Sequence, residues 1–371
     1  MKIGILTFHY AYNYGAVLQC YALQEALKEM GHEVSVIDYR QYDIANAYKL
    51  FRKKKILSKN PLLLVKNICK ETVLSPFKLK RKRSFEEFIK QNLNLTRRVS
   101  YDEIPDDFDV YIVGSDQIWN PKILGGKLDK AYLADFAFAR DGKILIAYAA
   151  SSGPGKFNEQ ALAQLKETAE RLDAVSVREE NLWKTIDPLT QKKVEIVVDP
   201  TLLVNRNVWN KFVGQRLVQE KYILVYQVVN HPETLLTAKK LSRELGVKVI
   251  EIGAITRTKI KDIFTKRLAD SPAVFLNLIK HAECMVTTSF HGTAISAIFN
   301  TPFYTIDINR KNDDRCANLL ELLGQRNRFI TSKFNENFTP VDFTKTNKIL
   351  ERIKTKSTLF LEEAINGKSV N

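Results

Sequence analysis

Short, almost continuously apolar segments alternate with helical segments along most of the chain. The first three are "KIGILTF" (2–8), a helical run (15–31) that ends on a glycine, and "HEVSVIDY" (32–39). Strands buried on both faces lack polar–apolar alternation, and parallel strands need a crossover helix between them. The pattern therefore predicts an α/β fold built on parallel sheets that helices cover on both faces.

The chain has 371 residues, which is too long for one ordinary core and fits two domains. The strand–helix rhythm pauses between about 203 and 220 and then starts again. We predict two Rossmann-like domains, 1–205 and 206–343, that face each other across a cleft, followed by a C-terminal helix and tail over 344–371. In such sheets ligands bind beyond the carboxyl ends of the strands, so residues that follow strands are the candidate site residues.

The formal net charge of +15 lies mostly in one segment, a basic insertion over about 47–98. This segment holds sixteen Lys or Arg against three Glu, and the remainder of the chain is nearly neutral. Its basic clusters alternate with apolar stretches, which is typical of a helix on an anionic membrane surface. A solvated flap is the alternative. Nucleic acid is disfavoured as a partner, because aromatic residues for base stacking are sparse.

No apolar run reaches the ~18 to 20 residues that a transmembrane helix needs. The four cysteines lie far apart, with neither zinc-site nor disulfide spacing. We therefore expect a cytoplasmic protein, with peripheral attachment to the inner face of the plasma membrane through the basic segment.

Two polar motifs follow strands in the first domain. "GSDQIWNP" (114–121) contains Asp116 and Gln117, which can bind hydroxyl groups, or can cap a turn. "FHYAYNYGAVLQ" (8–19) contains Tyr12, Asn13 and Gly15 in a polar, aromatic loop that suits carbohydrate; a well-packed turn is the alternative. The glycine at the helix N-terminus can admit an anion, but neither GxGxxG nor a P-loop is present.

In the second domain, "TTSFHGTAIS" (287–296) holds His291, one of only five histidines. Ser289 and His291 follow a predicted strand, and Gly292 opens a helix. A histidine in this place has a pKa suited to acid–base catalysis near neutrality. A lone histidine is more often a packed structural residue, so both interpretations stay open.

Two arginines are candidate anion ligands. Arg178 ends the buried strand of "AVSVREE" (174–180), where it must either pair with an acid such as Glu179 or face a ligand. Arg315 lies in the mixed-charge stretch 309–320, which is either an anion clamp or a capped helix start. Asp199, in "VVDPTLL", is interpreted as a mainly structural residue of the turn that precedes the proline.

The motifs occur together and in order: "FHYAYNYGAVLQCYAL", "VGSDQIWNP", "SVRE", "VDPTLL", "SFHGTAISAIFNTPF" and "DDRCANLL". In this combination the chain resembles the polysaccharide pyruvyl transferase family over most of its length, and least over 47–98. The resemblance implies a GT-B-like fold of two Rossmann-like domains. It also implies transfer of the pyruvate unit of phosphoenolpyruvate to sugar hydroxyls, which gives a pyruvate ketal and phosphate.

The resemblance further implies that His291 is the catalytic acid and that Arg178 and Arg315 hold the phosphate and carboxylate of phosphoenolpyruvate, beside Ser289 and Gly292. In many family members an arginine stands close before this histidine, where this chain has Phe290. We expect the acceptor to be a repeat-unit sugar, linked to polyprenyl diphosphate, bound by Tyr12, Asn13, Gly15, Asp116 and Gln117.

The implied reaction needs no metal and no cofactor besides the donor substrate, and the sequence has no metal-ligand spacing. Two alternatives remain at this stage. One is a GT-B glycosyltransferase that uses a nucleotide sugar, and the other is a non-catalytic carbohydrate-binding protein on the same scaffold.

Overall fold

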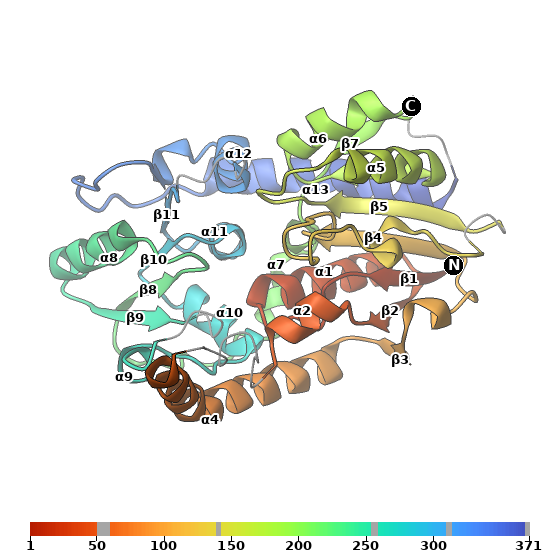
Figure 1. Cartoon of the computed structure of the whole chain (residues 1–371). Helices are drawn as coiled ribbons and strands as arrows, with labels where there is room; N and C mark the ends of the chain where they lie inside the picture. The colour runs from red at the N-terminus through yellow and green to blue at the C-terminus, as the bar shows by residue number, and fades with distance from the viewer. Residues whose placement is uncertain (50–59, 139–141, 254–258, 309–313, 368–371) are drawn as a thin grey trace.

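The computed structural model describes residues 1–49, 60–138, 142–253, 259–308 and 314–367. They form two parallel sheets with helices on both faces of each (Figure 1). The predicted α/β class with two Rossmann-like halves is confirmed by these sheets.

The first sheet has seven strands in the order β3-β2-β1-β4-β5-β6-β7, and every pairing is parallel. The strands are β1 (Lys2–Leu6), β2 (Glu33–Tyr39), β3 (Leu95–Val99), β4 (Val110–Asp116), β5 (Ile144–Ala150), β6 (Ala174–Val177) and β7 (Val194–Ile196). The central strands are buried on both faces, which explains their continuous apolar sequences.

Helices cover the two faces of this sheet. One face packs against α1 (Tyr14–Glu29), α4 (Pro61–Asn92) and α13 (Thr344–Ile365). The other face packs against α2 (Tyr42–Ala47), α5 (Glu159–Arg171) and α6 (Glu180–Ile186). The C-terminal helix thus returns from the second half of the chain to the first sheet, where the Val198 N–H donates to Ser357 Oγ at 3.1 Å.

The second sheet has five strands in the order β12-β11-β10-β8-β9, again all parallel. They are β8 (Tyr222–Tyr226), β9 (Lys248–Ile252), β10 (Cys284–Thr287), β11 (Phe303–Ile306) and β12 (Phe329–Ile330). Its helices are α8 (Pro232–Leu245), α9 (Asp262–Thr265), α10 (Pro272–Lys280), α11 (Phe290–Phe299) and α12 (Arg315–Leu322), and α7 (Arg206–Asn210) lies between the halves in sequence.

An apolar contact joins the two halves. Tyr14 of α1 stacks on Phe275 of α10 with ring centroids 4.2 Å apart, and both side chains are fully buried. One continuous hydrophobic core runs through this contact and reaches both sheets. The two halves are therefore packed against each other beside the cleft.

The basic segment 47–98 was predicted to be either a membrane-surface helix or a solvated flap, and its C-terminal part is neither fully exposed nor separate from the first sheet. Residues 50–59 lie outside the described part of the chain. Phe85 and Phe88 of α4 are buried in the core, and β3 pairs with β2. The solvated-flap interpretation is therefore wrong for the C-terminal part of the segment, which carries an edge strand of the first sheet. The apolar side chains interleaved with its lysines are core residues there.

Within the described ranges, no helix combines the length and the apolarity needed to cross a bilayer.

Arg81 of α4 connects both halves of the molecule. Its guanidinium donates to the Tyr12 carbonyl at 3.1 Å and, on the other side, to the Leu268 carbonyl at 3.3 Å. The same group lies over the ring of Tyr14 at 4.6 Å, and the side chain is only 2% exposed. No carboxylate of the described residues forms an ion pair with Arg81, so these carbonyl and aromatic contacts keep the buried cation in place.

We predict that Arg81→Met lowers the free energy of unfolding by about 1–3 kcal/mol, because it leaves buried carbonyl groups without donors. Urea-induced unfolding measures this loss. Lys80→Met, one residue away on the exposed side of α4, is the matched control and should change stability little. Equal stability of the two variants would show that Arg81 does not join the halves.

Candidate active site

A cavity of about 320 Å³ lies between the two halves, at the carboxyl ends of both sheets. Its walls come from the segments after β1, β4 and β5 on one side and after β8, β10 and β11 on the other. The residues most relevant here are Asn13, Asp116, Gln117, Asn120, Thr288, Ser289, Phe290, His291, Asp307 and Arg315. Candidate residues that follow strands in both halves thus line one cavity.

His291 is held in the first turn of α11, directly after β10. The Ser289 Oγ caps this helix and accepts from the Gly292 N–H at 3.2 Å. A Cβ at Gly292 would lie 2.7 Å from Thr287 Oγ1, so this turn requires glycine. The sequence Ser-Phe-His-Gly therefore fixes the histidine at the entrance of a helix, with 9% of its surface exposed.

The ring of His291 packs across the cleft on Gly15 of α1. A Cβ at Gly15 would lie 2.1 Å from His291 Nδ1 and 2.5 Å from Cε1. Asn13 caps α1, and its Oδ1 accepts from the Gly15 N–H at 2.9 Å. Glycine is needed here because the imidazole of the second half occupies the space beside the helix backbone of the first.

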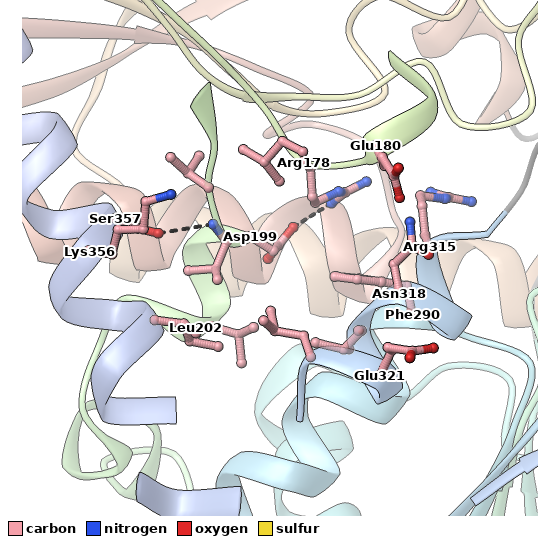
Figure 2. A pocket seen from close by; sticks show the side chains of 16 residues that line it. Arg178, Glu180, Asp199, Leu202, Phe290, Arg315, Asn318, Glu321, Lys356 and Ser357 are labelled. Carbon is pink, nitrogen blue, oxygen red and sulfur yellow. Dashed lines mark hydrogen bonds and ion pairs between the residues drawn. The ribbon is translucent and has the colours of Figure 1, made fainter. Parts of the chain in front are cut away.

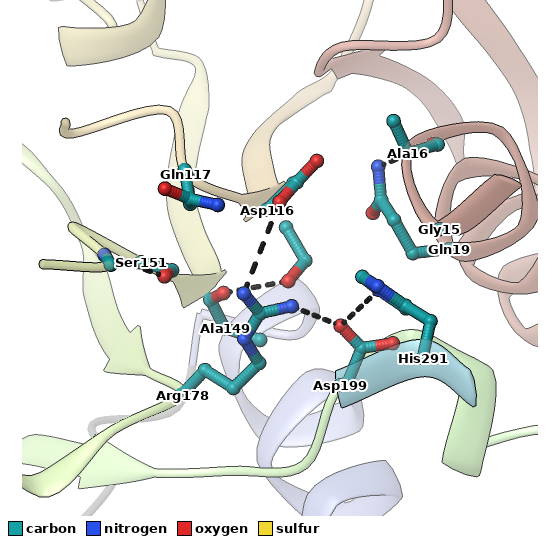
Figure 3. A network of polar contacts seen from close by, with 12 residues as sticks. Gly15, Ala16, Gln19, Asp116, Gln117, Ala149, Ser151, Arg178, Asp199 and His291 are labelled. Atoms are coloured by element: carbon teal, nitrogen blue, oxygen red, sulfur yellow. Dashed lines mark hydrogen bonds and ion pairs between the residues drawn. The ribbon is translucent and has the colours of Figure 1, made fainter. Parts of the chain in front are cut away.

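Asp199 joins two predicted site residues that come from different halves of the chain (Figure 3). Its Oδ2 accepts from Arg178 Nη1 and lies 3.4 Å from His291 Nε2. Its Oδ1 accepts from the N–H and hydroxyl of Thr201, at 3.0 and 2.7 Å. Burial raises the pKa of Asp199, but the charges of His291 and Arg178 outweigh burial and hold its pKa below the usual range.

Arg178 is buried at the end of β6 and has spare hydrogen-bonding capacity. Among the described residues, its Nε and Nη2 have no hydrogen-bond partner. Asp116 Oδ1 lies 3.9 Å from Nη2, and the ring of Phe290 lies under the guanidinium at 4.8 Å. The phenylalanine that precedes His291 in this chain thus supports Arg178.

Glu179 adds a second buried carboxylate beside Arg178. Its Oε1 accepts from the Ser151 hydroxyl at 2.7 Å and from the Ser152 and Gly153 N–H groups at 2.9 and 3.1 Å. Burial raises the pKa of this carboxyl group. The charges of Arg178 and Arg315 lower it, but burial has the larger effect. Its Oε2 is 3.8 Å from Arg178 Nε, so the ion pair foreseen for Arg178 is present, and Arg178 is not among the residues that line the cavity of His291.

Asp116 and Gln117 face His291 from the opposite wall of the cavity. Asp116 ends β4 with a φ of 68°, in the left-handed region, which turns the chain sharply after the strand. Gln117 Oε1 accepts from Asn120 Nδ2 at 2.7 Å. This wall therefore presents a carboxylate and amide groups, which are suited to hydroxyl ligands.

The model of one protein family, polysaccharide pyruvyl transferase, matches residues 13–310. The chain belongs to the polysaccharide pyruvyl transferase family. The match includes His291, Asp199, Arg178 and Asp116, whereas Tyr12 and Arg315 lie just outside it. Among curated proteins, no relative matches the chain.

Solved structures similar to this pyruvyl transferase family member are remote in sequence. UDP-GlcNAc 2-epimerase of Methanocaldococcus jannaschii is 13% identical, with 95% of this chain and 92% of that chain covered and a TM-score of 0.45. A putative UDP-N-acetylglucosamine 2-epimerase of Listeria monocytogenes is 10% identical, with 100% and 90% covered and a TM-score of 0.48. An alpha-glucosyltransferase in complex with UDP and DNA is 12% identical, with 99% and 93% covered and a TM-score of 0.44.

Not every predicted site residue reaches the cavity of His291. Tyr12 lies outside it, and its hydroxyl donates to Glu86 Oε1 of α4 at 2.8 Å. Arg315 lines the cavity from the start of α12, while residues 309–313 before it lie outside the described part of the chain. Asn13, Ser289, Asp116 and Gln117 line the cavity as expected, and Gly15 and Gly292 shape its surroundings.

Asp199 is the site residue that the sequence interpretation missed. The predicted turn exists, since Oδ1 binds Thr201, but Oδ2 faces Arg178 and His291. The available signal was a carboxylate in an otherwise apolar stretch with no basic neighbour in sequence. Such a buried charge requires a distant partner.

A second, larger cavity of about 640 Å³ lies behind this network (Figure 2). Arg178, Asp199, Phe290 and Arg315 line it, together with residues of α12 and α13, such as Ile353, and of the segment 196–202. Phe290 and Arg315 line both cavities. The arginine–aspartate pair is therefore bordered by open space on the side away from His291.

We predict that Gly15→Ala destabilises the protein by about 1–3 kcal/mol, because the added methyl group overlaps the ring of His291. In a His291→Ala background this cost should disappear, which a double-mutant cycle of unfolding free energies measures. Gly214→Ala, where a Cβ meets nothing within 4 Å, is the matched control. A Gly15→Ala cost that persists without the His291 ring would contradict the contact.

Proposed function

We propose that the protein transfers the pyruvate unit of phosphoenolpyruvate to two hydroxyls of a polysaccharide repeat-unit sugar and releases inorganic phosphate. Membership of the polysaccharide pyruvyl transferase family supports pyruvyl transfer in general. The observation that carries the finer proposal is the contact of His291, on the interdomain cavity, with the buried carboxylate of Asp199.

In this proposal His291 is the general acid. Asp199 stabilises the imidazolium through Nε2, as a buried carboxylate does for a neighbouring cation. Nδ1 lies beside Gly15 of α1, and His291 lines the cavity. Histidine is suited to this task because its ordinary pKa lies near neutrality.

The proposed reaction balances in two additions. The proton from His291 goes to the methylene carbon of phosphoenolpyruvate, which becomes a methyl group, and one sugar hydroxyl adds to C2. Phosphate then leaves with the C2–O bond electrons, and the second hydroxyl adds to C2 to close the ketal. One of the two hydroxyl protons restores His291 and the other ends on the phosphate.

The anionic donor is assigned to the side of the cavity that carries positive charge. Arg315 lines the cavity, and Ser289 and Gly292 form the start of α11, where the helix dipole favours anions. Arg178 does not line the cavity, but its Nε and Nη2 have no hydrogen-bond partner among the described residues. The acceptor hydroxyls are assigned to Asp116, Gln117 and Asn13, which line the cavity from the first half of the chain.

We predict that His291→Asn lowers phosphate release from phosphoenolpyruvate by at least about 100-fold in the presence of a sugar acceptor, the usual range for loss of a general acid. A coupled phosphate assay measures this. His281→Asn, at a histidine outside the cavity, is the matched control and should keep full activity. Phosphate release by His291→Asn at nearly the wild-type rate would show that His291 is not the general acid, even if the protein has the activity of its family.

The same assay separates the competing functions. A nucleotide-sugar glycosyltransferase would release a nucleoside phosphate and would ignore phosphoenolpyruvate. A non-catalytic carbohydrate-binding protein would bind the sugar without any turnover by the wild type. Either result would overturn the proposal.

We further propose that the acceptor is lipid-linked and that α4 lies against the membrane that carries it. The N-terminal part of α4 exposes Leu62, Leu63 and Ile68 beside Lys66 and Lys70, and Leu62 is 81% exposed. Apolar side chains with neighbouring lysines are the composition of helices that lie in an anionic membrane interface. Peripheral association at the cytoplasmic face is the localisation that this proposal implies.

We predict that replacing Leu62, Leu63 and Ile68 by Ser weakens binding to vesicles containing phosphatidylglycerol by about tenfold or more. The reason is that the substitution removes the apolar surface that the membrane would bury. Vesicle sedimentation at two salt concentrations measures it, and binding of the wild type should fall at high salt. Leu236→Ser, at an exposed leucine of α8, is the control. Unchanged vesicle binding by the triple variant would exclude α4 as the membrane contact.

A further inference from the structure

A second polar pocket lies on the other side of the loop that joins β1 to α1. It has a volume of about 200 Å³ and combines aromatic with basic side chains: Tyr10, Tyr12, Arg40, Ala45, Tyr48, Lys49, Lys82 and Arg98. No acidic side chain lines it among the described residues. The pocket therefore presents four cations and three phenol groups to one small volume.

The charge of this pocket is incompletely neutralised. Among the described residues, neither Lys49 nor Arg98 has an acidic partner within 4.0 Å. Lys82 lies 3.7 Å from Glu86, and that pair is well exposed. Exposed pairs of this kind are weak, so they leave most of the positive potential in place.

Arg40 is fixed in the pocket by a buried network. Its Nε and Nη2 donate to the two carboxylate oxygens of Asp38 at 2.6 and 2.9 Å. Asp38 is held in turn by His9 Nε2 at 3.0 Å, and both residues are buried. Burial raises the pKa of Asp38, but His9 and Arg40 outweigh it and keep the pKa low. The planar guanidinium is thus oriented in advance, which lowers the entropy cost of ligand binding.

The pocket is a neighbour of the catalytic cavity. Tyr12 lines the pocket, and Asn13, the next residue, lines the cavity of His291 on the side assigned to the acceptor. Tyr12 packs edge-on against Tyr48 with centroids 5.5 Å apart, so the loop forms the wall between the two spaces. An acceptor that extends from the cavity past this loop reaches the pocket.

We propose that this pocket binds a phosphate or diphosphate group carried by the acceptor substrate. The inference rests on the proposed function for the identity of the acceptor, but the anion site itself stands on the pocket. Lys49, Lys82 and Arg98, with Arg40 fixed beside them, match an anion with several charges and many acceptor oxygens. A single carboxylate would use only part of this set.

Binding of inorganic pyrophosphate tests the site directly. Isothermal titration should show that Arg98→Ala and Lys49→Ala each weaken pyrophosphate binding by about tenfold or more, since each removes a charged hydrogen bond. Arg97→Ala is the matched control, because Arg97 is the adjacent residue of β3, lies outside the pocket and pairs with Glu103 at 3.6 Å. Wild-type affinity in both pocket variants would overturn the proposal.

Turnover with matched acceptors tests the role of the site. A sugar diphosphate should be used with a kcat/KM about tenfold or more above that of the unphosphorylated sugar, and Arg98→Ala should remove this advantage while Arg97→Ala keeps it. An equal advantage in Arg98→Ala would overturn the proposal. An advantage for a prenyl diphosphate-linked sugar alone would assign the ligand as a lipid headgroup, and an equal advantage for the free sugar diphosphate would assign the phosphate group itself.

The two proposals fail separately. If the wild type released no phosphate from phosphoenolpyruvate with any acceptor, the proposed function would be wrong, and the pyrophosphate titration would still decide the anion site. If turnover occurred but the pocket variants bound pyrophosphate as tightly as the wild type, only the proposed anion site would be wrong.

Discussion

The buried carboxylate of Asp199 is the interaction on which the rest of the site depends. It lies between Arg178, at the end of a strand of the first sheet, and His291, at the start of a helix of the second half. Removing the carboxylate would leave the buried guanidinium of Arg178 without its closest partner, which is costly in a protein interior. This carboxylate therefore ties the relative position of the two halves to the position of the histidine.

The glycines and aromatic residues around this carboxylate follow from the same constraint. The imidazole can reach Asp199 only because Gly15 leaves space beside α1. The guanidinium lies on the face of Phe290, and its Nε and Nη2 have no hydrogen-bond partner among the described residues, although carboxylates lie 3.8 and 3.9 Å away. The site thus holds a histidine and an arginine from different halves of the molecule on one buried carboxylate, beside the cavity that His291 lines.

Much of the fold could be predicted from the sequence because it depends on local pattern. Continuous apolar strands, helix caps and the length of the chain specify two parallel sheets, and the helix over Thr344–Ile365 was predicted from its own segment. The basic segment was harder, because the buried faces of α4 are visible only when its partners in the second half are known. Arg81, for example, is one of many basic residues in sequence but is buried between carbonyls of both halves.

Site residues could be predicted where the residue type itself indicates a reactive or polar group. His291, Ser289 and Asp116 follow strands and carry reactive or polar groups, so their convergence on one cavity was expected from topology. Asp199 was not recognised, because a turn before proline explains its sequence context and its second role depends on contacts across the domain boundary. Tyr12 lines a different pocket from His291, since strand-end position does not tell which side of a loop a side chain faces.

The origin of the methyl hydrogens in the product tests the central claim most directly. If the enzyme protonates the methylene carbon of phosphoenolpyruvate, a reaction in D₂O gives a ketal whose methyl group carries a single solvent deuterium, which mass spectrometry and NMR detect. An unlabelled methyl group, or a product formed only from a nucleotide sugar, would contradict the account.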